Sequence, residues 1–132
     1  NKYLKSLIRA IYSNPPKHGA CIVATILDDP AFRENWKVEL ETMRRRIHEM
    51  RTLLVERLNQ TLGDNQFDFL AQQHGMFSFT GLKPEETDRL RDEFAIYLLR
   101  SGRINIAGIT TDNVQQICDA IATVRQSTSQ PA

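Results

Sequence analysis

The chain has 132 residues, of which 41% are hydrophobic and 25% are charged, and this balance is typical of one compact domain rather than a disordered or fibrous chain. Its 17 Lys and Arg residues against 16 Asp and Glu give a formal net charge of +1, which offers no general attraction to a nucleic acid or an anionic membrane. The longest apolar stretch, residues 20–27, is too short to cross a bilayer. We therefore expect neither a nucleic acid nor a membrane as partner, and a cytoplasmic location.

The first residues already follow a helical pattern. Apolar side chains recur at Leu4, Leu7, Ile8 and Ile11, at the spacing of one helix face. A chain that opens inside a helix and without Met is expected to begin within a longer protein. The string "YSNPP" at 12–16 stops the helix and fixes an extended corner. We therefore expect residues 1–16 to be a connecting helix and turn.

Residues 19–27 predict a short helix that is apolar on nearly all sides, and a helix of that kind is expected to be buried. Asp28, Asp29 and Pro30 follow, which predicts a cap and a first-turn proline for the next helix. The two cysteines, Cys21 and Cys118, lie far apart without a C-x-x-C or Cys/His cluster. They are predicted to be buried, reduced thiols.

The longest predicted element is one amphipathic helix of about thirty residues. Gly63 is placed to end it. The opposite face carries charges of both signs, including the "RRR" run at 44–46, and is interpreted as a solvated face rather than a nucleic-acid patch. The apolar stripe that predicts this helix runs at intervals of three or four through Phe32, Trp36, Leu40, Met43, Ile47, Met50, Leu54, Leu58 and Leu62.

The remaining pattern predicts a strand around 77–80, a helix from Pro84 to Gly102, a strand at 103–107 and a helix capped by Thr111. A strand, a helix and a strand can form a right-handed crossover with parallel strands, or pair through a partner strand. Two short strands make a poor sheet, so a third strand or covering surface is expected from elsewhere. The predicted fold class is α/β, an α+β small domain over 17–126 with a long helix and further helices on a small sheet, and a flexible tail at 127–132.

Residue types alone nominate no hydrolase, phosphate loop or metal centre. His18, His48 and His74 lie in three different local contexts, and no metal site is expected. Arg103 is the unusual residue, because a strand that enters a core seldom opens with a guanidinium, and a buried one needs an anion. The residues alone leave two partners for Arg103 equally possible: an acidic residue of this chain, or the carboxylate of a substrate. For Arg9, one turn before the "YSNPP" corner, an ordinary salt bridge is favoured on these grounds.

Four strings then place the chain near a known family: "IRAIYSNPPKHGACIVATIL", "ETMRRRIHEMR", "HGMFSFTGL" and "SGRINIAGITTDN". Together they resemble the C-terminal part of the aspartate and aromatic aminotransferases, which are fold-type I enzymes that use pyridoxal 5'-phosphate. The resemblance runs from about residue 3 to about 125. It implies that these residues are the C-terminal small domain and a connecting helix of such an enzyme, which moves the amino group of aspartate or an aromatic amino acid to 2-oxoglutarate.

The resemblance also implies roles for single residues. Arg103 stands in the "GR-x-N-x-AG" block, whose arginine binds the α-carboxylate of amino-acid and 2-oxo-acid substrates. Arg9 is expected to reach the neighbouring subunit's active site and pair with the distal carboxylate of aspartate or glutamate, which implies a homodimer with shared active sites. Phe77 is expected to line the substrate pocket. Ser13 and Asn14 are expected to lie near the cofactor phosphate.

One departure from the family pattern limits these expectations. Such enzymes hold their cofactor on a lysine within a pattern like S-x-S-K-N, and no lysine of this chain stands in that context. We therefore assign no catalytic residue to this chain and expect it neither to bind pyridoxal phosphate nor to transaminate by itself. The alternative is a non-catalytic helical interaction module that joins two copies. The lysines are Lys2, Lys5, Lys17, Lys37 and Lys83.

Overall fold

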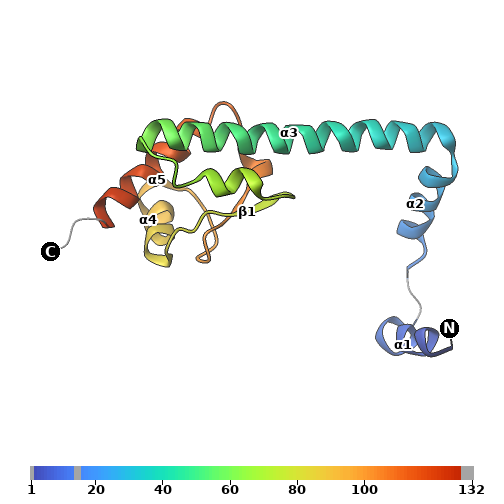
Figure 1. Ribbon diagram of the computed structural model, residues 1–132. Coiled ribbons are helices and arrows are strands. Elements are labelled where there is room, and N and C mark those ends of the chain that lie inside the picture. Colours follow the sequence, from blue (N-terminus) through green and yellow to red (C-terminus); the bar gives the residue numbers. More distant parts are fainter. Residues whose placement is uncertain (1, 14–15, 129–132) are drawn as a thin grey trace. The chain divides into compact units, whose positions relative to one another are not determined.

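The computed structural model describes residues 2–13 and 16–128 (Figure 1). The chain divides into two compact units, residues 1–42 and 43–132, and the long helix α3 contributes residues to both. The elements in chain order are α1 (Lys2–Tyr12), α2 (His18–Asp28), α3 (Pro30–Leu62), the short 3-10 helix η1 (Asp68–Gln72), β1 (Phe77–Phe79), α4 (Pro84–Phe94), β2 (Arg103–Asn105), the 3-10 helix η2 (Ile106–Gly108) and α5 (Val114–Thr128).

The first unit is helical and carries its apolar side chains at the surface. Helix α2 forms as predicted, but none of its residues is buried, so the expected buried helix is wrong in that respect. Cys21 is likewise exposed, against the expectation of a buried thiol. The reason is physical: burial needs surfaces packed around the helix, and the described residues of this unit leave only Ile26 of α2 half-buried.

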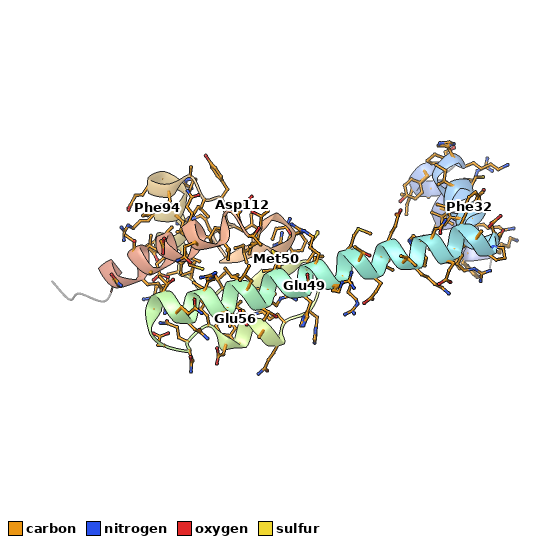
Figure 2. The ribbon with its side chains drawn as sticks, turned by 90° about the horizontal axis from the view of Figure 1, so that it is seen from above. Phe32, Glu49, Met50, Glu56, Phe94 and Asp112 are labelled. Carbon is orange, nitrogen blue, oxygen red and sulfur yellow. The ribbon has the colours of Figure 1, made fainter. Side chains whose placement is uncertain are left out.

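Helix α3 confirms the predicted long helix, with 33 residues. Its start is fixed by Asp29, whose Oδ1 accepts hydrogen bonds from the backbone N–H groups of Ala31 at 2.8 Å and Phe32 at 3.1 Å, as an N-cap does. Figure 2 shows Phe32 near the N-terminal end of the helix and Glu56 toward its C-terminal end. The stripe is buried only in its second half: Phe32 and Trp36 are exposed, whereas Leu54 and Leu58 are fully buried.

The "RRR" run is only partly the solvated face that the sequence predicts. Arg45 lies 3.9 Å from Glu49 as an exposed ion pair one turn along the helix. Arg46 instead donates to the carbonyl oxygens of Ala107, at 3.2 Å, and Ile109, at 3.1 Å. Arg46 therefore connects α3 to the chain that follows β2, a contact between distant residues that a local charge pattern cannot indicate.

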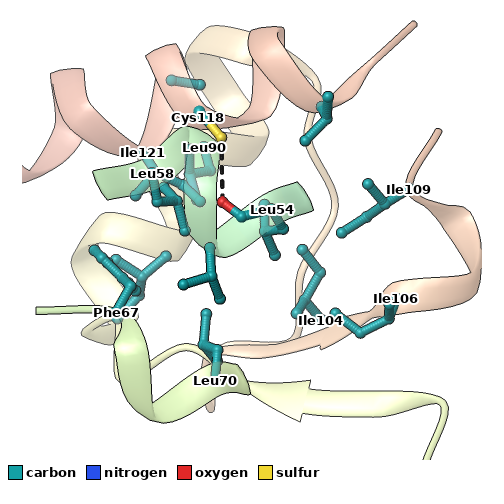
Figure 3. Packing of buried hydrophobic residues seen from close by; sticks show 14 of the residues in the cluster. Leu54, Leu58, Phe67, Leu70, Leu90, Ile104, Ile106, Ile109, Cys118 and Ile121 are labelled. Carbon is teal, nitrogen blue, oxygen red and sulfur yellow. Dashed lines mark hydrogen bonds between the residues drawn. The ribbon is translucent and has the colours of Figure 1, made fainter. Parts of the chain in front are cut away.

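The hydrophobic core belongs to the second unit. Figure 3 shows Leu54 and Leu58 of α3 meeting side chains from η1, β2, α4 and α5. The Cys118 thiol points at the carbonyl oxygen of Leu54, 3.9 Å away. Cys118 is fully buried, which confirms the predicted buried thiol for this cysteine, and burial raises its pKa to about 12. The buried side chains labelled there are Leu54, Leu58, Phe67, Leu70, Leu90, Ile104, Ile106, Ile109, Cys118 and Ile121.

The described strands form one small antiparallel sheet, not the parallel pair that a right-handed crossover would give. Ser78 pairs with Ile104, Phe77 with Asn105 and Phe79 with Arg103. On the outer edge of β1, the Gln73 side chain accepts from Phe79 N–H at 2.8 Å and donates to Phe79 C=O at 3.1 Å. The amide group thus bonds to the edge of β1 as a neighbouring strand would. A third strand from outside stays a prediction.

Helix α4 ends earlier than predicted, at Phe94 rather than at Gly102. Ala95 takes a left-handed conformation with φ 55, and Ile96 N–H donates to Leu90 C=O at 3.0 Å, so the helix ends there. The chain then runs extended to β2, with Ile96 and Leu98 half-buried and Tyr97 and Leu99 exposed. Charges at 85–93 favour the helix, and the β-branched and aromatic residues after them favour extended backbone.

Helix α5 begins with a cap one residue before the predicted Thr111. Thr110 Oγ1 accepts from Asn113 N–H at 3.2 Å, while Asn113 Oδ1 accepts from Thr110 N–H at 2.8 Å, a reciprocal capping box. The overall expectation of a long helix and further helices packed on a small sheet is confirmed.

Candidate functional site

The candidate site lies on the outward face of the two-stranded sheet. Side chains alternate across a strand, so Ser78 and Ile104 face the core, where both are buried. Phe77 and Asn105 pair on the other face, next to Phe79 and Arg103. The strand that opens with Arg103 therefore places this guanidinium outside the core, and a buried cation at the start of β2 is avoided.

The backbone at Arg103 is held by Gly102 and Thr80. The Gly102 carbonyl oxygen accepts from Thr80 N–H at 2.9 Å and from Thr80 Oγ1 at 2.8 Å. Gly102 has φ 77, and a Cβ added there would lie 3.0 Å from the Leu82 carbonyl oxygen. Both the left-handed backbone and the lack of space require glycine at position 102. The backbone that carries the Arg103 side chain is therefore held in one place.

The Arg103 guanidinium lies over the ring of Phe77, with Cζ 4.7 Å from the ring centroid, within the range of a cation–π contact. Within residues 2–13 and 16–128, no carboxylate forms an ion pair with Arg103. The intramolecular salt bridge that the sequence left open is therefore not made among these residues. The guanidinium keeps its five N–H donors in a planar fork.

Arg103 and Phe77 line a groove of about 330 Å³ together with Tyr97, Leu98, Leu99 and Asn105. Tyr97 and Leu99 were assigned to a helix from the sequence, so their part in the groove was missed. The signal that could have found them is the short continuous apolar run at 96–99, which follows a charged helical stretch and is also consistent with extended backbone. The groove combines an aromatic wall, an amide and one cation, a set suited to a small carboxylate with an apolar part.

Arg9 and Ser13 lie in the other unit, and they are exposed. Arg9 is in the last turn of α1, where its carbonyl oxygen accepts from Ser13 N–H at 3.0 Å. Ser13 has φ 62, an uncommon value for a residue other than glycine. Asn14 lies outside the described residues. The structure thus brings Phe77 and Arg103 together, and Arg9 and Ser13 are adjacent at the end of α1.

Other classes of site leave no sign in the described part of the chain. No group of three or more His, Cys, Asp or Glu side chains there is arranged to hold a metal ion. Of the helices described, none is both long enough and apolar enough to span a membrane.

The family model that describes aminotransferase class I and II matches residues 1–121. An aspartate aminotransferase from Haemophilus influenzae is 51% identical over 121 residues, which are 92% of this chain and 31% of that protein. The solved structure of the cytoplasmic aspartate aminotransferase of Saccharomyces cerevisiae is similar with a TM-score of 0.89 at 41% identity, over 97% of this chain and 31% of that one.

A second similar structure is the aromatic-amino-acid aminotransferase of Burkholderia pseudomallei, which is covalently bound to pyridoxal phosphate. Its TM-score is 0.85 at 48% identity, over 92% of this chain and 30% of that one. The chain thus spans about a third of the length of the relatives that it matches. With a family match over nearly its whole length, the chain belongs to the class I and II aminotransferases.

Proposed function

We propose that this chain is the C-terminal part of an aminotransferase that moves the amino group of aspartate or an aromatic amino acid to 2-oxoglutarate. The family supports the reaction class, and the names of the relatives support the two proposed substrate classes. In this proposal the chain contributes recognition of the substrate carboxylates. Arg103 binds the α-carboxylate, and Phe77 lines the pocket.

The observation that carries the proposal is the state of the Arg103 side chain. It is half-buried, it lies on the Phe77 ring, and it has no carboxylate partner among the described residues. The backbone of Arg103 is fixed, and its guanidinium plane lies against an aromatic ring. The side chain therefore loses little conformational entropy when a carboxylate binds it through two parallel hydrogen bonds. The groove beside it, with Tyr97 and Leu99, has room for the apolar part of an amino acid.

Pyridoxal phosphate is the cofactor that the family leads us to expect, and it supplies the electron sink for amino-group transfer when bound. The groove residues do not fit this cofactor by themselves, because its attachment requires a lysine and no lysine lines the groove. We therefore place the cofactor lysine outside these 132 residues. The isolated chain is expected to show no Schiff-base absorbance with pyridoxal phosphate and no bleaching by aspartate.

The roles of Arg9, Ser13 and Asn14 belong to the same proposal. Arg9 pairs with the distal carboxylate of aspartate or glutamate in the neighbouring subunit of a homodimer, and Ser13 and Asn14 lie near the cofactor phosphate. What supports Arg9 is its exposure at the end of α1, next to the unusual backbone of Ser13. The cytoplasmic location stays a prediction from the sequence.

A chimera tests the proposal. Residues 1–121 of this chain replace the matching segment of the Haemophilus influenzae aspartate aminotransferase, and transfer from aspartate and from phenylalanine to 2-oxoglutarate is measured. Arg103→Lys in the chimera is expected to lower kcat/KM for both amino acids by at least about a hundredfold, because lysine cannot form the two parallel bonds. Arg9→Leu should lower it for aspartate alone.

Asp112→Asn, on the turn before α5, is the matched control and should change neither substrate. An active chimera that is insensitive to Arg103→Lys would overturn the assignment of the α-carboxylate site. Equal losses for both substrates in Arg9→Leu would overturn the role of Arg9 in binding the distal carboxylate.

The alternative function is a helical interaction module, and one observation favours it. The first unit exposes large apolar side chains on all of its helices, among them Tyr3, Leu7, Ile22 and Phe32, more than an isolated soluble surface usually carries. Sedimentation of the 132-residue chain tests it, and Arg103→Ala should leave any self-association unchanged. The two functions are compatible, since one concerns the parent enzyme and the other the isolated chain.

A further inference from the structure

Arg51 is a buried guanidinium that none of the roles above uses. It lies on α3 and is only 3% exposed. Its Nε donates to Ser78 Oγ at 3.3 Å, and its Nη2 donates to the carbonyl oxygen of Gly75. Both acceptors are neutral, and within the part of the chain that the structure describes no carboxylate pairs with Arg51.

Burying a cation that has only neutral acceptors costs desolvation free energy that no ion pair offsets. Burial lowers the pKa of Arg51, yet a guanidinium stays charged at neutral pH, so its desolvation is not relieved by losing a proton. An apolar side chain of similar volume is often at least as stabilising at such a place. What the guanidinium adds is geometry. Its two hydrogen bonds leave one rigid plane, so they fix the positions of Gly75 and Ser78 relative to α3.

Those two points lie on either side of Phe77. Gly75 is in the turn before β1, and Ser78 is the central residue of β1. Since side chains alternate across the strand, Ser78 faces Arg51 and the core, while Phe77 faces outward and contacts Arg103. Gln73 bonds to the backbone of Phe79 on the outer edge of the strand. Strand β1 is therefore held by Gln73 at its edge and by Arg51 on its core face.

We propose that Arg51 is a positioning residue that holds the Phe77 ring against the Arg103 guanidinium from the opposite face of the sheet. The proposal rests on the proposed function of Arg103, and adds a residue that never touches the substrate. Loss of Arg51 lets β1 shift relative to α3. The ring then no longer fixes the plane of the guanidinium, and the carboxylate fork loses its orientation.

The first experiment uses the 132-residue chain and needs no substrate. The Nε–Hε resonance of Arg103, assigned by its disappearance in Arg103→Lys, is expected to be shifted upfield by the Phe77 ring, and Phe77→Leu should remove that shift. Arg51→Lys is expected to remove at least half of it, because an ammonium cannot make both bonds. Ser78→Ala, a smaller change, is expected to remove part of it.

Leu58→Ala is the matched control, since Leu58 is buried on the same helix and its loss lowers stability without touching β1 bonds. It should lower the melting temperature and leave the Arg103 resonance in place. An unchanged Arg103 resonance in both Arg51→Lys and Ser78→Ala would overturn the proposal. So would an equal loss of the shift in Leu58→Ala, because Arg51 would then act through stability alone.

The second experiment uses the chimera. Arg51→Lys is expected to raise KM for aspartate roughly tenfold, as expected for a weakened bond to a charged group, with kcat changed by less than about twofold. A loss confined to kcat would contradict positioning of the carboxylate site. If Arg103→Lys leaves the chimera's KM unchanged, the proposed function fails, and the resonance of Arg103 alone then decides whether Arg51 positions the Phe77–Arg103 pair.

Discussion

The two halves of helix α3 follow one apolar pattern and differ in burial. Phe32, Trp36 and Leu40, in the first unit, are exposed, whereas Leu54 and Leu58, in the second, are fully buried. Helical spacing is the same in both halves. What differs is the presence of η1, β2, α4 and α5 around the second half. Periodicity therefore predicts which face of a helix is apolar, and burial depends on a partner surface.

The two cysteines compare burial in the two units for a single type of side chain. The difference in their labelling rates is the largest effect that we expect. Cys21 of the first unit is exposed, and Cys118 of the second is buried. Burial raises the pKa of Cys118 to about 12 from its ordinary 9.0, so its thiolate fraction at about pH 8 is roughly a thousandfold lower. We expect an aromatic disulfide reagent to label Cys21 at least about a thousand times faster, as measured by absorbance and peptide mapping.

The sign of the pH dependence follows from the same shift. The folded state binds the Cys118 proton more tightly than the unfolded state, so this contribution to stability is complete below the ordinary pKa of 9.0. It is lost as the pH rises from there toward about 12. Cys118→Ala should therefore flatten the decline of the urea midpoint above about pH 9. Comparable labelling rates for the two cysteines would mean that the second unit opens readily.

Leucine truncation compares the two halves of α3 directly. Leu58→Ala is expected to lower the free energy of unfolding by about 2–5 kcal/mol, because it leaves a cavity in the core. Leu40→Ala, on the same helix in its exposed half, should change it by less than about 0.5 kcal/mol. Urea denaturation of the 132-residue chain, followed by circular dichroism, measures both. A loss at Leu40 as large as that at Leu58 would show that the first unit has a covered face in solution.

Two glycines extend the comparison to the backbone. Gly102 has φ 77 and a Leu82 carbonyl oxygen 3.0 Å from the position of an added Cβ, whereas nothing lies within 4 Å at Gly19 of α2. Gly102→Ala is expected to lower the free energy of unfolding by about 1–3 kcal/mol. Gly19→Ala should raise it by about 0.5–1 kcal/mol, because alanine loses less entropy in a helix. Thermal unfolding of both variants measures the difference, and a loss at Gly19 would contradict the structure of α2.

Local signals in the sequence predicted the elements well where the determinants lie within one turn. Asp29 and Pro30 predicted the start of α3, and the stripe through Leu58 predicted its length. Phe77 and Phe79, alternating with small polar residues, predicted β1. The same kind of signal placed Arg103 at the start of a strand, behind a glycine that the structure requires.

The end of α4 and the cap of α5 were missed although their determinants are local. Other features escaped prediction because they depend on contact between residues distant in sequence. The antiparallel pairing of β1 and β2 joins residues far apart in the sequence. The bond from Arg46 to Ala107 and the bond from Arg51 to Gly75 depend on where α3 lies in the second unit. No local pattern encodes that place. The groove at Arg103 was only half predicted, with Phe77 assigned through the resemblance and Tyr97 missed because residues 96–99 were predicted as helix.

Two threonines give the smallest expected effect and test the backbone of the site itself. Thr80 is buried, and its Oγ1 donates to Gly102 C=O at 2.8 Å and accepts from Leu82 N–H at 3.3 Å. Thr25 of the first unit is exposed, and its Oγ1 bonds to Cys21 C=O, one turn back in α2. Thr80→Val is expected to lower the free energy of unfolding by about 1–2 kcal/mol, since it leaves buried polar groups with fewer partners.

Thr25→Val, the same change of atoms at the surface, should stay within about 0.5 kcal/mol. The two variants differ further in the chimera, where Thr80→Val alone is expected to raise KM for aspartate, because the residue before Arg103 loses one of its two bonds. Equal stabilities with an unchanged KM would mean that the backbone N–H of Thr80 holds Gly102 without the hydroxyl. The position of Arg103 would then depend on the sheet and on glycine alone.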